Sequence, residues 1–430
     1  MSEQPGRSVK EAVARGIAAR YRKERLFRAL GLGALLIGLG FLAFFFYTLI
    51  GNGYTALGQT RILLDVDLAE EVIDPEGARD PEILAAADYQ RLVREALNRL
   101  FPDVTARAQL RELYSMVSPG AGFELRERVR DDPSVIGTTH SLWLLADDDV
   151  DVIVKGHVDR ALPQDQRRTS DQELEWLAAL EAQDRVDIQL NRYFFTAGAS
   201  TDPELAGIWS ATVGSFFMLL VTLTLAFPLG VATAIYLEEF ASRNRWTDLI
   251  EVNINNLAAV PSIVYGLLGL AVFINAFGLP RSAPLVGGLV LSLMTLPVII
   301  IASRAALTAV PPSIREAALG VGASKMQMVL HHVLPLAMPG MLTGTIIGMA
   351  RALGESAPLL MIGMVAFIVD IPESPLDPST ALPVQVYLWA DSPERAFVER
   401  TSAAILVLLV FLLVMNATAI LLRKRFERRY

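Results

Sequence analysis

The amino-acid sequence predicts an α-helical membrane protein with six transmembrane helices and a soluble domain inserted between the first and second of them. The chain of 430 residues is 53% apolar with a mean hydropathy of +0.41, which is high for a soluble protein of this length. Its apolar stretches are long enough to cross a hydrocarbon core of ~30 Å. A polar, acidic stretch, residues 51–205, separates the first apolar stretch from the second.

Charge is distributed unevenly along the chain. Residues 51–205 contain 30 acidic and 16 basic side chains, a net charge of −14, whereas the whole chain carries −8, so the remainder carries +6. Basic side chains gather in residues 1–28 and 423–429, and the positive-inside rule places such segments in the cytoplasm. The acidic segments 51–205 and 370–400 then lie outside the cytoplasm, which agrees with six crossings.

The start of the chain and the cysteine content exclude several classes of protein. The chain contains no cysteine, so it has no disulfide framework, thiolate metal site or cysteine nucleophile. The apolar residues 29–50 follow the basic segment 1–28 as a full-length span, without a clear small-residue cleavage site. We therefore expect a transmembrane helix there and no cleavable signal peptide.

Residues 51–205 are expected to fold as a small α/β or mainly helical domain. Ser170 and Glu173 have the spacing of a capping box, which predicts the start of a helix. The expected elements are helices at residues 80–100, 102–116 and 170–182 and strands at residues 143–145 and 150–154.

Four aspartates near the expected strands could suggest a cation site: Asp147, Asp148, Asp149 and Asp151. They lack the glycine and the distal glutamate of a calcium loop, so we favour a solvated acidic turn. His140 and His157 are isolated in the sequence, without a nucleophile–base arrangement around them. We expect both histidines to be structural or surface groups.

Five further apolar stretches predict the remaining spans: residues 208–237, 254–277, 284–302, 341–368 and 403–422. A short polar loop, residues 238–251, joins the first two of these. Several spans contain prolines, which either kink the helix or free backbone groups that line a cavity. They are Pro228, Pro261, Pro297, Pro339 and Pro358. Gly340, Gly344 and Gly348 form a small-residue face suited to close helix packing.

Residues 313–334 form a polar, helix-prone segment between the fourth and fifth spans. Ser313 is expected to cap this helix, with Glu316 in a capping box, and the helix should end before Pro335. Small side chains give it a surface that another protein could approach closely: Ala317, Ala318, Gly320, Gly322 and Ala323. Its composition is compatible with an ordinary interfacial helix or with a docking helix.

Two charges interrupt the fifth apolar stretch, where a charge costs about 2.5–3.5 kcal/mol on insertion scales. Arg351 and Glu355 are four residues apart, so they can pair on one helix face. One interpretation is a structural ion pair that locks the span. The other is a site in a translocation path, because a guanidinium donates two parallel hydrogen bonds to a tetrahedral oxyanion. The two interpretations are compatible.

The spacing of residues in the polar segment resembles the EAA loop of ABC-importer permeases. Glu316-Ala317-Ala318 is followed by Gly322 and, after twelve more residues, by Pro335. The resemblance implies that residues 313–334 are the cytoplasmic coupling helix that docks into an ATPase subunit. His332 departs from the aliphatic residue that is usual in this family.

Three separated motifs resemble the A-type permease subunits of bacterial phosphate-specific (Pst) ABC transporters: Arg351 to Glu355 with Ala357-Pro358, Val260 to Leu267, and Ala206-Gly207-Ile208. The resemblance covers residues 194–425 and the first span. It implies a type I ABC-importer permease core at residues 206–425, in the bacterial inner membrane, that imports inorganic phosphate. Arg351 and Glu355 match residues of the family's translocation path.

The same resemblance implies a set of partners. They are a homologous second permease subunit, ATPase subunits and a periplasmic phosphate-binding protein. Residues 51–205 replace a loop that is short in commoner members, so the chain resembles the extended amino-terminal version of this subunit, with a periplasmic domain there.

The chain lacks a G-x-x-x-x-G-K-[ST] phosphate loop, so we expect ATP hydrolysis in a partner and no enzyme activity, cofactor or metal in this chain. Two alternatives stay open. The first is a permease for another oxyanion, such as sulfate or molybdate, which would share the docking segment. The second is a membrane signalling or scaffold subunit, for which residues 51–205 would matter and Arg351 would not.

Overall fold

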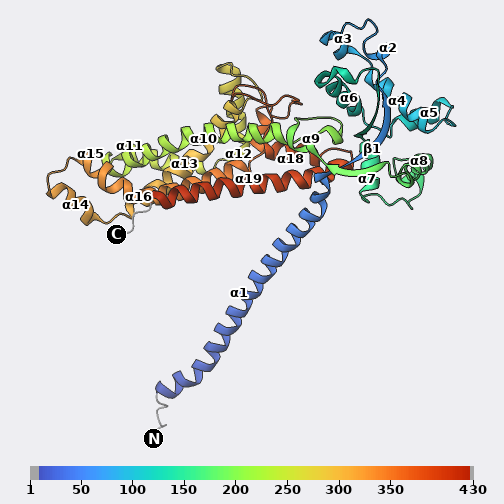
Figure 1. The fold of residues 1–430 in the computed structure, drawn as a ribbon. Helices are drawn as coiled ribbons and strands as arrows, with labels where there is room; N and C mark the ends of the chain where they lie inside the picture. The colour runs from blue at the N-terminus through green and yellow to red at the C-terminus, as the bar shows by residue number, and fades with distance from the viewer. Residues whose placement is uncertain (1–8, 427–430) are drawn as a thin grey trace, which may run out of the picture. The chain divides into compact units, whose positions relative to one another are not determined.

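The computed structural model describes residues 9–426, so residues 1–8 of the expected basic tail and 427–430 lie outside the described residues. The chain divides into two units, Met1–Asn52 and Gly53–Tyr430. The described residues of the first unit lie in the long helix α1, Val9–Gly53, whose last residue begins the second unit (Figure 1). At 1.5 Å per residue, its 45 residues extend over about 68 Å, more than a hydrocarbon core requires. The expected span 29–50 is therefore helical, and the same helix continues back through the expected tail to Val9.

The second unit begins with an α/β part, residues 54–205, called the sheet region below. Its antiparallel sheet has the order β2-β1-β3, with β1 at Gly58–Asp67, β2 at Thr139–Leu145 and β3 at Val186–Leu190. Ile62 of the central strand lies opposite Leu144 on one side and Val186 on the other. The strand expected at residues 143–145 is confirmed within β2. Strands β1 and β3 were not predicted.

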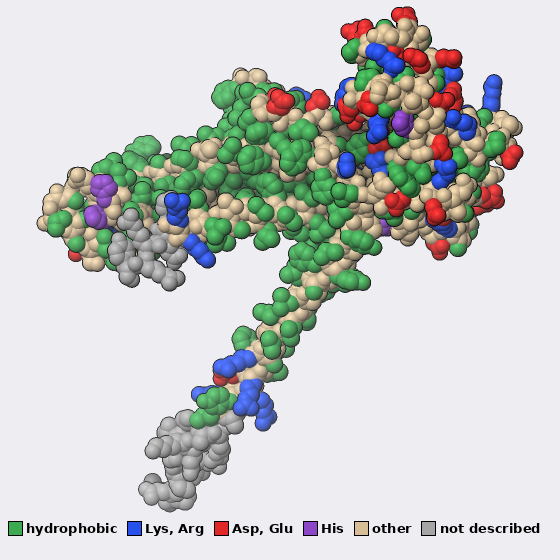
Figure 2. Space-filling view, viewed as in Figure 1, with side chains coloured by type: hydrophobic (Ala, Val, Ile, Leu, Met, Phe, Trp, Pro, Cys, Tyr) green, Lys and Arg blue, Asp and Glu red, His purple; other side chains and the backbone are tan. Residues whose placement is uncertain are grey.

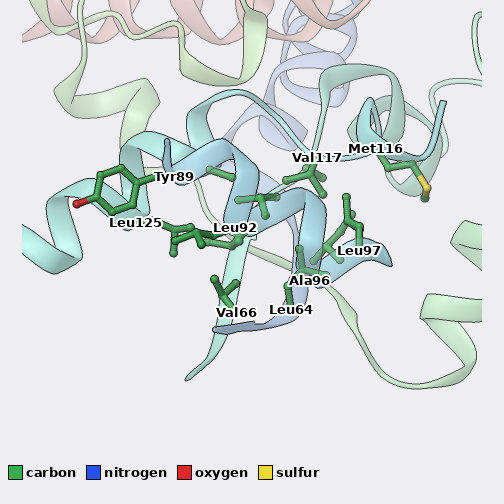
Figure 3. Packing of buried hydrophobic residues seen from close by; sticks show 14 of the residues in the cluster. Leu64, Val66, Tyr89, Leu92, Ala96, Leu97, Met116, Val117 and Leu125 are labelled. Carbon is green, nitrogen blue, oxygen red and sulfur yellow. The ribbon is translucent and has the colours of Figure 1, made fainter. Parts of the chain in front are cut away.

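Short helices accompany this sheet, most of them packed with its central strand in one apolar core. They are α2 Glu70–Ile73, α3 Pro81–Ala86, α4 Tyr89–Leu100, α5 Arg107–Tyr114, α6 Gly120–Asp131, α7 Asp148–Val154, α8 Asp171–Ala182 and α9 Arg192–Thr196. Single 3₁₀ turns lie at Tyr54–Leu57, Pro133–Val135, Gln164–Gln166 and Pro203–Leu205. Leu64 and Val66 of β1 pack with Leu92 and Leu97 of α4 in a buried core (Figure 3).

Local capping explains where the expected elements of the sheet region differ from those observed. The helix expected at residues 80–100 is broken because Asp88 accepts a hydrogen bond from the Arg91 amide and starts a new helix. The helix expected at 102–116 begins only at Arg107. The predicted capping box of Ser170 and Glu173 is confirmed.

The strand expected at residues 150–154 is wrong, because this segment forms α7. The Asp147 carboxylate accepts a hydrogen bond from the Asp149 amide at 3.1 Å, which caps the helix. An N-cap aspartate and acidic side chains in the first turn favour helix over the strand preference of the valines that follow.

Residues 206–426 form a second part of the same unit, called the helical core below. Its long helices are α10 Trp209–Ile235, α13 Pro284–Thr308, α16 Leu334–Leu353 and α19 Ala396–Phe426. Figure 2 shows hydrophobic side chains over the visible face of the helical core and charged ones over the sheet region. Within the described residues, five helices are long and apolar enough to cross a membrane, or six if one bent pair counts as a span.

The bent pair corrects the single span expected at residues 254–277. Helix α11, Arg245–Ala258, turns by 104° into α12, Ser262–Leu268, and the π-helical segment Gly269–Ala276. Pro261 lies at the turn, and the residue before a proline disfavours helical backbone, which explains the break. The expected polar loop 238–251 is also largely helical, since α11 begins inside it.

The predicted close contact of the glycine face is confirmed. A Cβ atom on Gly344 would lie 2.1 Å from the Ala302 Cβ, and one on Gly340 would lie 2.7 Å from the Ala306 Cβ. Both alanines belong to α13. The small residues therefore let α16 lie directly against α13.

The spans at the end of the chain differ from the prediction in extent. The expected span 341–368 ends at Leu353, and a short helix, α17 Ala357–Met361, follows it. The segment 370–400, expected to be a loop, contains α18 Leu382–Ala390 and the first turn of α19.

The expected solvated acidic turn is a partly buried helix start, because Asp147, Asp148 and Asp149 cap and open α7 and are of intermediate exposure. Burial raises the pKa of Asp147 to about 8, and neighbouring carboxylates raise it further. Burial likewise raises the pKa of Asp148 to about 6 and that of Glu204 to about 7. The carboxylates of Asp147, Asp148 and Asp149 lie within 4.8 Å of one another. Asp147 caps α7, and Asp148 and Asp149 lie in its first turn.

We expect Asp147→Asn to raise the thermal stability of the full-length protein at pH 8 and to flatten its pH dependence. The folded protein holds a proton on Asp147 that the unfolded chain, with a carboxyl pKa near 3.8, releases. The protonated Asp147 carboxyl therefore contributes fully to the free energy of unfolding at low pH. This contribution is lost as the pH rises from ~4 to ~8, by about 1.4 kcal/mol for each pH unit. Asparagine keeps the cap without ionising. Unfolding monitored by tryptophan fluorescence between pH 5 and 8 measures this effect.

The matched control is Asp187→Asn, which removes an exposed carboxylate from β3 in the same region. A pH dependence that is the same in Asp147→Asn, Asp187→Asn and the wild-type chain would contradict the burial argument.

Candidate functional site

Arg351 lies in the last turn of α16, and Glu355 lies just beyond the helix end at Leu353. The Arg351 Nε atom is 3.5 Å from the Glu355 Oε1 atom, so the structure brings the expected pair together. The arginine side chain is 52% exposed and the glutamate 20%. The pair therefore lies at a helix C-terminus, where a cation is favoured by the helix dipole, rather than within a continuous helix.

Two of the three separated motifs meet next to this pair. A Cβ atom on Gly266 would lie 2.7 Å from both the Cα and the carbonyl oxygen of Pro358, so α12 and α17 pack backbone to backbone. The Tyr265 hydroxyl donates a hydrogen bond to the Leu257 carbonyl across the bend, at 2.7 Å. The bend between α11 and α12 and the break after Leu353 thus both lie close to the Arg351–Glu355 pair.

The third motif, Ala206-Gly207-Ile208, lies elsewhere. The Ala206 carbonyl accepts a hydrogen bond from Arg400 at 2.8 Å. A Cβ atom on Gly207 would lie 2.5 Å or less from the carbonyl oxygens of Ala197 and Tyr193. This motif therefore joins the sheet region to the helical core.

The chemistry available at the pair is recognition of an anion. A half-exposed guanidinium has hydrogen-bond donors that a single carboxylate contact does not occupy, and its planar fork suits a tetrahedral oxyanion. Glu355 can orient the guanidinium, or accept a hydrogen bond from a protonated oxyanion.

The polar segment 313–334 was predicted to be one helix, but it contains a short helix and the start of a second, longer one. Helix α14, Pro312–Gly320, ends before Gly322, whose φ of +92° is left-handed. Helix α15, Lys325–Met328, then continues through a π-helical segment, Val329–Val333, into α16. A left-handed residue after a helix end is typical of glycine, which explains the break.

Both predicted ends of this segment are wrong. Pro311 is the N-cap residue of α14, so Ser313 lies inside the first turn, and the observed capping box is that of Ser324 and Gln327. The helix does not end before Pro335, because this residue lies in the first turn of α16, within a continuous helix from Lys325 to Leu353.

The candidate docking residues differ in exposure. Glu316, Ala317 and Gly322 are exposed, whereas Ala318 is only 5% exposed and packs inside the fold. Large apolar side chains are exposed beside them, a set called the coupling patch here: Leu319, Val321, Met326 and Leu330. The spacing of the small residues did not predict this apolar patch.

Charged residues anchor this segment to the helical core, and the sequence analysis did not identify them. The Arg315 guanidinium contacts the Glu239 carboxylate at 2.8 Å and donates to the Leu307 carbonyl at 2.8 Å. Arg304 likewise contacts Glu238 at 3.3 Å and Glu251 at 2.9 Å. The acidic and basic residues that flank the apolar stretches in the sequence could have predicted these ion pairs. The Arg315 contacts fix α14 against α13 and the π-helical segment Tyr236–Phe240 that follows α10. The Arg304 contacts tie α13 to that segment and to α11.

Comparison with known proteins gives two family matches. Residues 226–430 match the family described as binding-protein-dependent transport system inner membrane component. Residues 14–164 match a domain of unknown function, DUF3333. A subunit of the MetNI methionine ABC transporter has a TM-score of 0.42 at 18% identity and covers 51% of this chain and 94% of that one.

Individual relatives fall in the same class. The chain is 35% identical over 173 residues to the probable ABC transporter permease protein YqgI of Bacillus subtilis, covering 40% of this chain and 58% of that protein. It is 33% identical over 233 residues to the phosphate transport system permease protein PstA 1 of Mycobacterium tuberculosis, covering 54% of this chain and 75% of the relative. The PstA of Mycobacterium leprae is 32% identical, with 51% and 71% covered. The chain therefore belongs to the family of PstA-like permease proteins of ABC transporters.

Proposed function

We propose that this chain is a transmembrane permease subunit of an ATP-driven importer of inorganic phosphate. The observation that carries the proposal is the 33% identity to a phosphate transport system permease over three quarters of that protein. The half-exposed Arg351–Glu355 pair, next to the packed α12 and α17, supports it as a site for an oxyanion in the translocation path. The chain would not hydrolyse ATP, which is the work of a partner.

A permease of this class works with a second permease, an ATPase and a substrate-binding protein. For this chain we propose a homologous second permease and a periplasmic phosphate-binding protein. We also propose the bacterial inner membrane with both termini in the cytoplasm, because Arg423, Lys424 and Arg425 end α19. The sheet region is then periplasmic, and the coupling patch faces the cytoplasm.

The continuity of one helix supports a coupling mechanism. The helix from Lys325 to Leu353 begins beside the coupling patch and carries Arg351 in its last turn. Its 29 residues extend over about 43 Å. ATP-driven closure of a docked ATPase would move the start of this helix. The same rigid body would then shift Arg351, which is alternating access through helix movement.

Another tetrahedral oxyanion, such as sulfate or molybdate, is the second candidate substrate, because the guanidinium fork fits any of them. Glu355 favours phosphate among these. A carboxylate accepts a hydrogen bond from protonated phosphate, whereas sulfate carries no proton near neutral pH to donate.

We expect Arg351→Ala to reduce phosphate uptake at least tenfold in cells that lack their own importer, because the oxyanion loses its bidentate donor. Arg351→Lys should retain an intermediate rate, since it keeps the charge without the fork. Radiolabelled phosphate uptake at matched membrane expression, with sulfate and molybdate as competitors, is the measurement.

Arg281→Ala, which removes an exposed arginine elsewhere in the helical core, is the control and should not change uptake. Normal uptake by Arg351→Ala would exclude a role for this arginine in the path. Competition by sulfate as strong as that by phosphate would assign the importer to another anion.

Docking through the coupling patch has its own test. We expect Val321→Glu to weaken ATPase-subunit binding at least tenfold in purified membranes, because this side chain is 86% exposed and apolar. Gly322→Trp should have the same effect, but its left-handed backbone adds strain, so Val321→Glu is the cleaner variant.

Phe123→Glu, an exposed apolar position of the sheet region, serves as the control. If Val321→Glu retained the ATPase subunit as tightly as Phe123→Glu, the coupling patch would not be the docking surface.

A further inference from the structure

A buried group of charges joins the sheet region to the last long helix. Lys155 follows the last residue of α7, and its Nζ atom lies 2.7 Å from the Oδ2 atom of Asp151 in the same helix. The same Nζ atom lies 2.7 Å from the Oε1 atom of Glu399 in α19. These three side chains are only 2–3% exposed. The second Glu399 oxygen is 3.0 Å from the His157 Nε2 atom. We call these four residues the lysine clamp.

The lysine clamp is continuous with the central strand and with the start of α10. The Asp151 carboxylate also accepts a hydrogen bond from the Thr60 amide of β1 at 2.8 Å. Arg400, next to Glu399, is 1% exposed and donates to the Ala206 carbonyl at 2.8 Å. Residues from β1, α7, α19 and the segment before α10 are thus held by buried polar contacts.

Packed side chains and backbone surround these contacts. The ring centroids of Phe194, in the sheet region, and Trp389 are 6.3 Å apart. Trp389 stacks in turn on Phe397 of α19, with 5.8 Å between the ring centroids. A Cβ atom on Gly198 would lie 2.0 Å from the Val369 carbonyl oxygen. The sheet region is therefore packed against the helical core on several segments, unlike a domain attached by a flexible linker.

We propose that the sheet region is a rigid extension of α19, and that the lysine clamp keeps the two moving as one body during transport. A buried charge that loses its partner is strongly destabilising, so a displacement that parts Lys155 from Glu399 while the site stays closed to water is costly. Helix α19 packs in turn against α16, and Arg423 donates to the Thr343 hydroxyl at 3.1 Å. A displacement of the sheet region can therefore reach the helix that carries Arg351.

This inference gives the sheet region a mechanical role, and its transport part rests on the function proposed above. It also has a consequence for deletion. Removing residues 60–190 would remove Asp151, Lys155 and His157 together. Glu399 would then lose its buried partners, so the helical core should fail to assemble rather than work without an accessory.

Amide hydrogen exchange of the full-length protein in nanodiscs tests the rigid connection without reference to any substrate. Glu399→Gln keeps the side-chain shape and leaves the Asp151–Lys155 pair intact, so the chain should fold. We expect exchange to accelerate at least tenfold in both residues 148–157 and residues 396–404, and to stay unchanged in α4. Acceleration in only one of the two segments, or in neither, would overturn the proposal.

Glu95→Gln is the matched control, because Glu95 makes an ion pair of similar length with Arg91 at the exposed surface of the sheet region, at 2.8 Å. It should change exchange in neither segment.

Compensating substitutions test the electrostatic contact between Lys155 and Glu399, which are 244 residues apart in the sequence. Lys155→Met leaves the carboxylates of Asp151 and Glu399 facing each other, so we expect at least a tenfold loss of folded protein in membranes. Adding Asp151→Asn and Glu399→Gln removes both unpaired charges and should restore most of it. A triple variant no better than Lys155→Met would contradict the clamp.

Uptake separates this inference from the proposed function. If Glu399→Gln loosens both segments and lowers phosphate uptake at least tenfold at normal assembly with the ATPase, the rigid body serves transport. If it loosens both segments while uptake stays normal, the mechanical role is wrong and the importer stands. If the wild-type chain itself imports no phosphate, the proposed function fails, while the exchange result still decides the rigid connection.

Discussion

The close approach of α13 to its neighbours is the constraint on which the helical core depends. Lipid gives apolar helices little reason to associate, so packing of atoms has to hold them together. Gly288 of α13 lies against Val221 of α10, where an added Cβ would be 2.5 Å from the valine Cβ. Gly344 of α16 lies against Ala302 on another part of α13. Because the glycines in these contacts have no side chains that could adjust, α13 fixes the position of α16. It thereby fixes the candidate sites near the two ends of that helix.

Arg315 of α14, near the start of that helix, and Arg351, in its last turn, are held differently, and the difference fits their proposed roles. Arg315 is satisfied by a carboxylate and two carbonyls and is mostly buried, which suits an anchor. Arg351 has a longer contact to one carboxylate, and half of its side chain is exposed. A fully satisfied arginine has few donors left for a ligand. An arginine held by one orienting partner keeps donors available, which is what oxyanion recognition requires.

Local patterns in the sequence predicted much of the helical core and the charge pair. Long apolar stretches predict helices reliably because lipid leaves few alternatives for the backbone. Arg351 and Glu355 were found because charges inside such a stretch are rare. The small-residue face of α16 was predicted for a similar reason, since three glycines at four-residue spacing leave one side of the helix without side chains.

The missed features depend on contacts that sequence spacing does not reveal. Pro335 was expected to end a helix, but the helix continues through it, and the π-helical segment Val329–Val333 lies where the proline removes a backbone donor. The strand pattern of β1 was overlooked, although Ile62, Leu64 and Val66 alternate as buried residues. Most of all, Lys155 and Glu399 meet across 244 residues. Only the fold brings such distant partners together.

The same burial changes how the acidic sheet region bears on phosphate import. Its formal charge of −14 would repel an approaching anion. Physiological salt screens this repulsion beyond about 8 Å. That count treats every carboxylate as ionised. Burial raises the pKa of Asp147 to about 8 and that of Glu204 to about 7, so these two groups hold much of a proton near neutral pH. The repulsion is therefore weaker than the composition indicates, and delivery of phosphate by a binding protein would avoid what remains of it.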